Sequence, residues 1–242
     1  LYSVINDQYK SIKNLNNSVK KNIELLKLDN TYTVCTGHQL SLLTGPIYFI
    51  YKIISTINLT KILNKKYPEF NFVPIFWMAS EDHDFEEVNH VSLYGEKFVW
   101  KSDEKGIVGD FKTKGILEII EEIDSFLGNK TDNKSLMRLL KKCYSETTLS
   151  EASRNLINEL FGKYGLVILD SNDKDLKKKL IPIMKEDMVY QSLFPTIKKN
   201  TDINSLIYKT QAFVRDINFF KISEDNRVRV LESVSENEIE NN

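Results

Sequence analysis

The sequence predicts an α/β protein: a parallel sheet with helices on both faces, together with a small inserted α+β connecting region. Three features lead to this prediction. A β-branched segment at residues 31–36 precedes a helical pattern at residues 47–66, and an apolar run, FVPIFWMA, follows at residues 72–79. The run does not alternate with polar residues, which is typical of a strand buried on both faces of a parallel sheet. Strand, crossover helix and strand form a βαβ unit, in which ligands bind at the carboxyl ends of the strands.

The N-terminal part shows a helix and then the first strand of this unit. Apolar residues recur every three or four positions over residues 4–28, which predicts one amphipathic N-terminal helix. The loop after the first strand contains Gly37 and Gly45, and Pro46 opens the crossover helix because proline fits a first helical turn. Pro74 cannot donate to a neighbouring strand, so the first residues of the second strand are expected at an edge or a bulge.

The rest of the chain mixes a hairpin, helices and further strands. Short alternating pieces at residues 91–111 predict an inserted hairpin, and LVILD at residues 166–170 predicts another buried parallel strand. Helices are predicted at residues 116–127, 135–144, 150–164 and 174–199, and the last is broken near Pro182 and Pro195. A meander of strands is predicted at residues 212–214, 218–222 and 227–231, with a turn at residues 224–226. We expect three parts: a first part of the core with the N-terminal helix at residues 1–90, the inserted hairpin and helical region at residues 91–164, and a return to the core sheet followed by a helix and the meander at residues 165–242.

Composition narrows the function classes. With 242 residues, 41% hydrophobic, and a net charge of −1, the chain can form a packed core but has no bulk positive charge for nucleic acid or an anionic membrane. No apolar stretch approaches the ~20 residues of a membrane span. Cys35 and Cys143 form no CxxC pattern, so free thiols in a reducing cytoplasm are expected, and Cys35 and Trp77 are expected in the core. The chain opens at Leu1 on a helical pattern, which indicates a segment of a longer protein.

The first candidate cluster lies where the first strand ends and the crossover helix begins. Its members are Thr36, Gly37, His38 and Gln39, followed by Thr44 and Gly45. A helix start offers unpaired backbone N–H groups and the positive end of the helix dipole, which together suit an anion. His38 could donate to a phosphate or to a developing negative charge, and Lys52 could face the same anion or be an ordinary surface lysine. The structural alternative is a tight turn with a hydrogen-bonded histidine.

The second cluster follows the second strand and is rich in acids. Its members are Ser80, Glu81, Asp82, His83 and Asp84, with Glu86, Glu87, Asn89 and His90 close behind. Crowded carboxylates and an imidazole push pKa values apart, which suits proton transfer. One alternative is an acidic solvated loop in which Asp84 caps a helix. A second alternative is a metal site with ligands drawn from Asp82, His83, Asp84, His90 and His38, but the HExxH, HxH and HxxxH spacings are absent, and no metal is predicted.

Arg215 is a further candidate in the C-terminal part. It lies in the sequence Arg215-Asp216-x-Asn218 between two predicted strands. An arginine in this position could form an internal ion pair or bind a substrate carboxylate through two parallel hydrogen bonds. Both interpretations stay open.

Two long segments resemble a known family. TGHQLSLLTGPIYFIYKIISTINL and VPIFWMASEDHDFEEVNHV are similar to the paired signature of the bacillithiol biosynthesis cysteine-adding enzymes, the cysteine ligases of that pathway, and QAFVRDINFF with DNRVR resembles their next segment. The likeness extends over residues 1–231. Members are about twice as long, so it implies that this chain is an incomplete fragment. The fragment lacks the second part of the sheet and the helical coiled coil that pairs full-length members as homodimers.

The family resemblance also implies a fold and an activity. The family core is similar to the Rossmann-like fold of class I aminoacyl-tRNA synthetases, and residues 36–39 stand where that superfamily keeps phosphate-contacting histidines, with Gln39 in the place of a second histidine. The implied activity is a cytoplasmic ligase that joins the carboxylate of cysteine to the amine of glucosaminyl-malate. ATP is the expected activating cosubstrate by analogy of fold.

Roles for individual residues follow from their placement. We interpret His38 and neighbouring backbone amides as stabilising negative charge on the activated acyl group. Asp82, His83 or Asp84 would take the proton of the amine, and Lys52 or Arg215 would hold the malyl carboxylates, arginine being better suited to a bidentate grip. Substrate or anion binding is expected from Thr36, Gly37, Gln39, Thr44, Gly45, Ser80, Glu81 and Asn89.

Two other functions fit parts of the pattern. The acidic cluster could belong to a metal-dependent hydrolase, and the strand-end loops could form a non-catalytic module that binds a nucleotide or a sugar phosphate. Whatever its function, the fragment is expected to have an exposed sheet edge or apolar face where the missing half belongs, and therefore a tendency to associate.

Overall fold

The chain forms two compact units. The computed structural model describes residues 1–10, 12, 15–128, 133–145, 147–210, 213–222 and 227–230. The first unit spans Leu1–Asn172 and the second spans Asp173–Asn242. Because the last strand of the central sheet ends at Asp170, the sheet and the inserted region together make up the first unit.

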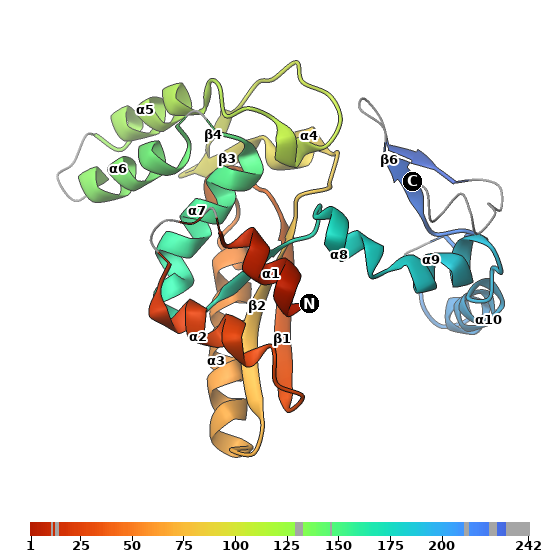
Figure 1. Cartoon of the computed structure of the whole chain (residues 1–242). Helices are drawn as coiled ribbons and strands as arrows, with labels where there is room; N and C mark the ends of the chain where they lie inside the picture. The colour runs from red at the N-terminus through yellow and green to blue at the C-terminus, as the bar shows by residue number, and fades with distance from the viewer. Residues whose placement is uncertain are drawn as a thin grey trace. The chain divides into compact units, whose positions relative to one another are not determined.

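A three-stranded parallel sheet in the order β1-β2-β5 organises the first unit (Figure 1). Strand β1 spans Thr31–Gln39, β2 spans Asn71–Ala79 and β5 spans Val167–Asp170. Strand β1 pairs with β2 along its whole length, whereas β5 pairs with β2 only from Ile75 onward. The predicted parallel sheet is therefore confirmed. Pro74 lies just before the pairing with β5 begins. The central strand accommodates it because no β5 residue there needs the N–H that proline lacks.

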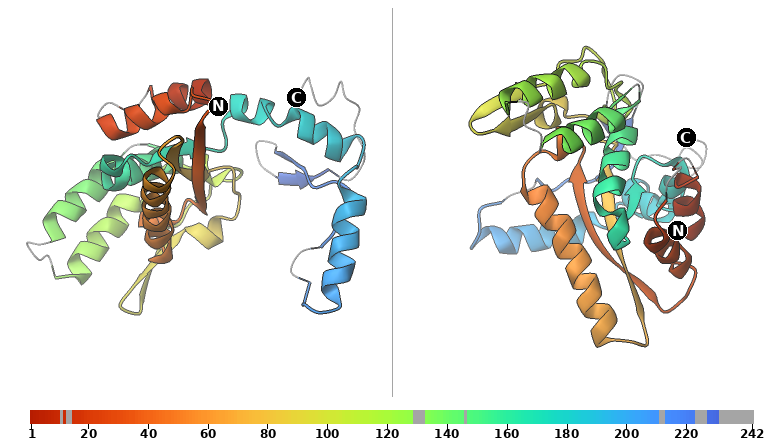
Figure 2. Two further views of the ribbon diagram at one scale, coloured as in Figure 1. Left: turned by 90° about the horizontal axis from the view of Figure 1, so that it is seen from below. Right: turned by 90° about the vertical axis from the view of Figure 1, so that its left-hand side faces the viewer.

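Helices cover both faces of the sheet, as the sequence predicts (Figures 1 and 2). The crossover helix α3, Tyr48–Lys66, packs on the face that carries Phe76, where Phe49 meets Phe76 edge to face at 5.3 Å between ring centroids. Helix α7, Leu149–Phe161, lies on the same face, and α1, Tyr2–Gln8, and α2, Asn17–Leu25, lie on the other. The core is therefore a layer of apolar side chains on each side of β2.

Three expectations about the N-terminal part are wrong. The single helix predicted over residues 4–28 is two helices, because Asn16 has extended dihedrals (φ −60°, ψ 140°) immediately before α2, and asparagine side chains compete for the helical backbone. Cys35 is exposed, since β1 is an edge strand. Trp77 is 36% exposed, because the sheet face at that end of β2 is only partly covered.

The inserted region begins with the short helix α4, Phe85–Val88, and a hairpin. Its strands are β3, His90–Leu93, and β4, Glu96–Val99, paired antiparallel. The hairpin is confirmed but is shorter than predicted, since residues 108–110 form a 3-10 turn instead of a strand. Helices α5, Ile116–Phe126, α6, Lys134–Cys143, and α7 follow as predicted.

The second unit contains three helices and a small antiparallel pair of strands. These are α8, Lys174–Lys178, α9, Ile181–Met188, α10, Phe194–Ser205, β6, Phe220–Ile222, and β7, Arg227–Arg229. Pro182 and Pro195 each lie in a first helical turn, which explains the predicted breaks. Of the predicted strand at residues 212–214, Phe213 and Val214 are not in a strand, and Ala212 and the turn at residues 224–226 lie outside the described residues.

The two edges of the sheet differ. Side chains occupy the outer edge of β5: the amide of Gln8 accepts from the N–H of Asp170 (2.9 Å) and donates to its carbonyl (3.1 Å). The N–H of Ile168 donates to the Tyr9 hydroxyl (2.6 Å), and Arg154 donates to the Ile168 carbonyl (2.9 Å). Within the first unit, no described strand pairs with the outer edge of β1, so the predicted exposed edge is present.

Helix α3 also carries apolar side chains on its outer surface. The most exposed are Tyr48, Tyr51, Leu59 and Ile62, together with Ile47 just before the helix. In the described part of the chain, no helix is both long and apolar enough to cross a membrane.

Candidate active site

A pocket of about 330 Å³ lies at the carboxyl end of β1, where the sequence analysis expects a site. The end of β1, the start of α3, helix α4 and strand β3 all contribute to it. Its lining residues are His38, Gln39, Ser41, Gly45, Pro46, Tyr48, Glu87, His90, Val91 and Ser92. The first turn of α3 therefore borders the pocket, and the positive end of its helix dipole favours a negatively charged ligand group.

His38 is held in a defined orientation at this pocket. Its ring centroid lies 5.2 Å from that of Tyr48 and 5.4 Å from that of Phe49. The Nδ1 atom lies 3.1 Å from the carbonyl oxygen of Gln39. A carbonyl can only accept, so in the neutral ring Nδ1 carries the proton and Nε2 is the basic nitrogen. Burial lowers the pKa of His38, and the nearby Lys52 ammonium adds to this effect, so the ring is neutral at pH 7.

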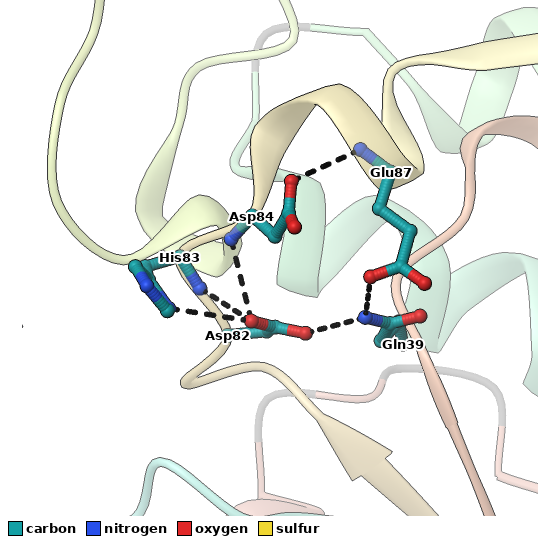
Figure 3. Close-up of polar contacts among 5 residues, drawn as sticks. All are labelled: Gln39, Asp82, His83, Asp84 and Glu87. Carbon is teal, nitrogen blue, oxygen red and sulfur yellow. Dashed lines mark hydrogen bonds and ion pairs between the residues drawn. The ribbon is translucent and has the colours of Figure 1, made fainter.

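Gln39 connects the first strand to the acidic segment (Figure 3). Its side-chain nitrogen donates to Asp82 Oδ2 at 2.6 Å and to Glu87 Oε2 at 2.7 Å. One amide group thereby holds two carboxylates that would otherwise repel each other, one after β2 and one on α4. The clusters predicted separately at the ends of β1 and β2 are therefore in direct contact.

Asp82 remains ionised in this arrangement. Burial by itself would raise the pKa of its carboxyl group. Hydrogen bonds from Gln39 and from the backbone N–H groups of His83 (2.7 Å) and Asp84 (3.3 Å) outweigh burial, so the pKa lies below its ordinary value. A carboxylate with a lowered pKa is a weak base, which favours a positioning role for Asp82.

The other two catalytic candidates of the acidic segment do not line the pocket. Asp84 accepts a hydrogen bond from the N–H of Glu87 at 3.3 Å and is the N-cap of α4, so the helix-capping interpretation is confirmed for it. The His83 side chain is 49% exposed, with Nδ1 3.5 Å from Asp82 Oδ1. Figure 3 shows His83 on the far side of Asp82 from Gln39, and Asp84 above Asp82 with its carboxylate toward the backbone N–H of Glu87.

Ser80, Glu81 and Asn89 do not line the pocket themselves. The buried Ser80 hydroxyl donates to Asp170 of β5, and Glu81 contacts the hydroxyl of Ser171. The side-chain oxygen of Asn89 lies 3.1 Å from His90 Nδ1. Ser80 and Glu81 therefore join β2 to the segment after β5, while Asn89 orients a histidine that does line the pocket.

Thr36, Gly37, Thr44 and Lys52 are predicted site residues that do not line the pocket. Thr36 is half-buried within the strand, and Gly37 allows close packing, since an added Cβ would lie 3.2 Å from the Trp77 carbonyl oxygen. Lys52 does not line the pocket, because its ammonium donates to the Gly37 carbonyl at 2.5 Å. Thr44 has a positive φ of 77° in the turn before α3.

Arg215 belongs to the second unit. Its guanidinium carbon lies 5.6 Å from the ring centroid of Phe220. The neighbouring Asn218 binds the fully buried Asp187, donating from its backbone N–H (2.6 Å) and from its side chain (2.9 Å). A carboxylate-binding role for Arg215 remains a prediction.

Seven lining residues of the pocket were not among the predicted site residues: Ser41, Pro46, Tyr48, Glu87, His90, Val91 and Ser92. The sequence offers a signal for two of them, since Glu87 and His90 stand close behind the acidic cluster. Ser41 and Tyr48 have no comparable signal. In the part of the chain that the structure describes, no group of three or more His, Cys, Asp or Glu side chains is arranged to hold a metal ion.

Comparison with known proteins identifies the family. The sequence model described as "Bacillithiol biosynthesis BshC, N-terminal Rossmann-like domain" matches residues 1–242. The chain belongs to this family. The Rossmann-like fold expected from the sequence is thereby confirmed, together with the resemblance on which that expectation rests.

Relatives named "Putative cysteine ligase BshC" agree with this assignment. The protein of Christiangramia forsetii is 47% identical over 238 residues, and that of Flavobacterium johnsoniae is 44% identical over 232 residues. Each alignment covers 96% of this chain and 44% of the relative. The protein of Bacillus cereus is 28% identical over 216 residues, which cover 86% of this chain and 38% of the relative. The chain therefore spans less than half the length of these BshC relatives.

Proposed function

We propose that this chain is the N-terminal part of a ligase that joins the carboxylate of cysteine to the amine of glucosaminyl-malate. The family match and the names of the relatives support a cysteine ligase of bacillithiol biosynthesis. The observation that carries the catalytic assignment is the contact between His38 and the Gln39 carbonyl at the mouth of the pocket.

The reaction imposes two requirements. A carboxylate and an ammonium group do not condense in water at neutral pH, so the carboxylate must gain a leaving group and the amine must lose a proton. ATP, by analogy of fold alone, would supply the leaving group. The start of α3 at the pocket offers backbone N–H groups to its phosphates.

The side chains of the pocket suit an amine nucleophile. In the proposed step the ammonium first loses one proton to solvent, and the neutral amine nitrogen then forms a bond to the activated carbonyl carbon. His38 Nε2 takes the second proton from nitrogen as the bond to the leaving group breaks and the leaving group departs with its electron pair. Glu87 places a negative charge on the pocket wall, which attracts the amine while it is still an ammonium. The geometry thus favours His38 as the base, instead of the anion-stabilising role expected from the sequence.

The test uses the full-length protein, assayed for thiol product from cysteine, glucosaminyl-malate and ATP. His38→Gln removes the basic nitrogen and is expected to lower kcat by roughly 10²–10⁴-fold, the usual contribution of a general base. Cys35→Ala, on the same strand but outside the pocket, is the matched control and should leave kcat unchanged.

The outcome also separates a ligase from a binding module. Turnover of His38→Gln within a few fold of the unsubstituted protein would remove His38 from catalysis. Thermal stabilisation by the substrates without any product, in the unsubstituted protein, would favour a module that only binds them.

A further inference from the structure

A second pocket, which no role in the proposed reaction uses, lies between α2, α3 and the first residues of β2. Its volume is about 220 Å³. Its lining residues are Ser18, Lys21, Asn22, Ile57, Thr60, Lys61, Asn64, Phe72, Pro74, Tyr164 and Gly165. Lys61 lies more than three helical turns beyond Tyr48 on α3, roughly 20 Å along the helix axis. The two pockets are therefore separate sites at opposite ends of α3.

The walls of this second pocket are fixed by hydrogen bonds to the backbone. The Asn64 side chain accepts from the N–H of Phe72 and donates to its carbonyl, both at 2.9 Å. The Asn22 side chain donates to the carbonyl of Gly165 at 2.6 Å. These bonds join α3 to β2 and α2 to the segment before β5. The cavity is therefore formed without a ligand, as small-molecule sites usually are.

The charge around the pocket is one-sided. Lys21 and Lys61 line it, and the lining residues in the described part of the chain include no carboxylate. Two ammonium groups converge on one aromatic ring, since Lys61 Nζ lies 5.5 Å and Lys163 Nζ 4.9 Å from the ring centroid of Tyr164. Ser18 lies in the first turn of α2, where backbone N–H groups lack helical partners. Unbalanced positive charge beside such donors attracts an anion.

We propose that this second pocket binds a small phosphate-bearing anion. Lys21 and Lys61 supply the positive charge as two point charges, and the hydroxyls of Ser18 and Tyr164 supply further donors to phosphate oxygens. The pocket is smaller than the ~300–1,000 Å³ of typical ligand sites, which indicates a ligand not much larger than the anion itself. The proposal does not depend on the ligase reaction.

The experiment titrates inorganic phosphate into the chain and follows backbone amide resonances by NMR, at constant ionic strength with chloride. Saturable shifts are expected at Asn22, Tyr164 and Gly165. The double variant Lys21→Gln/Lys61→Gln should weaken binding at least tenfold. Lys65→Gln, an exposed lysine of α3 outside the pocket, is the matched control and should stay within twofold.

Three results would overturn the proposal. The first is a set of small amide shifts that are spread over many lysines and do not saturate. The second is phosphate binding by the double variant as tight as that of the unsubstituted chain, when both have the same melting temperature. The third is saturable binding confined to His38 and its neighbours, which would place the only anion site at the start of α3. A parallel titration with succinate tests the ligand class: equal affinity for this dicarboxylate would contradict the assignment to phosphate.

Discussion

At the scale of single residues, the two ring nitrogens of His38 have different roles because only one of them faces a carbonyl oxygen. The neutral ring is the basic form, and its pKa lies below the ordinary value of 6.5. We therefore expect the acid limb of kcat/KM that His38→Gln removes from the full-length protein to lie below pH 6.5. Asp82, whose pKa lies below its ordinary value of 3.8, stays charged throughout this range and contributes no such limb.

The same shift affects stability. The unfolded chain binds a proton at His38 more readily than the folded chain, so stability decreases as the pH falls through 6.5. His38→Gln should remove this part of the pH dependence of the melting temperature between pH 7 and pH 5. Loss in His38→Gln of an acid limb above pH 6.5, or an unchanged melting profile in the variant, would contradict the assignment.

Sequence reasoning identified the strand ends that carry the site but not the contacts between their side chains. His38 and Gln39 could be predicted because both follow a β-branched strand and precede a helix. That Gln39 would bridge two carboxylates depends on the side-by-side pairing of β1 and β2 in register, which no local pattern encodes. Ser80 was misleading for a similar reason, since its partner Asp170 lies on a strand far along the chain.

At the scale of secondary structure, the turn before α3 is the most constrained element of the pocket. Leu43, Thr44 and Gly45 have positive φ values of 50°, 77° and 58° in succession. At Gly45 an added Cβ would lie 2.4 Å from the Cβ of Ser41, so a side chain there collides as well as straining the backbone. The N–H of Leu43 is held by the buried Tyr144 hydroxyl at 3.2 Å, which fixes the turn from outside the pocket.

Comparing the unfolding free energies of two glycine-to-alanine variants separates the cost of a steric collision from the cost of backbone strain. Gly95, in the hairpin turn, also has a positive φ, of 91°, but an added Cβ would meet no atom within 4 Å. Gly95→Ala should cost about 1–2 kcal/mol of unfolding free energy from strain alone. Gly45→Ala should cost a further 1–3 kcal/mol because of overpacking, as measured by urea unfolding. Equal losses would show that the turn can relax.

The N-terminal helices show that apolar periodicity predicts helical residues but not where one helix ends and the next begins. The apolar spacing over residues 4–28 is continuous, and it is satisfied by two helices as well as by one. Helix α1 ends at Gln8, and α2 begins at Asn17, directly after the extended backbone of Asn16. By contrast, α3, β2 and β5 were predicted within a residue or two, because long apolar segments bounded by glycine or proline are strong local signals.

At the scale of the whole chain, the open edge of β1 and the exposed apolar surface of α3 predict self-association. Exposed side chains on this face include Tyr32 on β1 and Tyr51 and Ile62 on α3. We expect the 242-residue chain to form dimers or larger species at micromolar concentrations in sedimentation experiments. Thr33→Lys, at an exposed position of β1, should shift the population toward monomer.

A matched control tests whether this edge is responsible. Tyr94→Lys changes a side chain that is 91% exposed at the hairpin turn, away from β1, and should leave the association unchanged. A chain that stays monomeric at all concentrations, or responds equally to both substitutions, would contradict the prediction.

The side chains bonded to the outer edge of β5 leave only the β1 edge of the central sheet able to pair with another strand. Gln8, Tyr9 and Arg154 already satisfy the backbone groups that another strand would need there. When only the β1 edge is available, two copies that pair through β1 leave no free edge in either sheet. Association through this edge therefore stops at a dimer. A molecule with both margins available could polymerise into a continuous ribbon. Gln8 at the end of α1, together with Tyr9 and Arg154, would therefore prevent the sheet from growing beyond a pair.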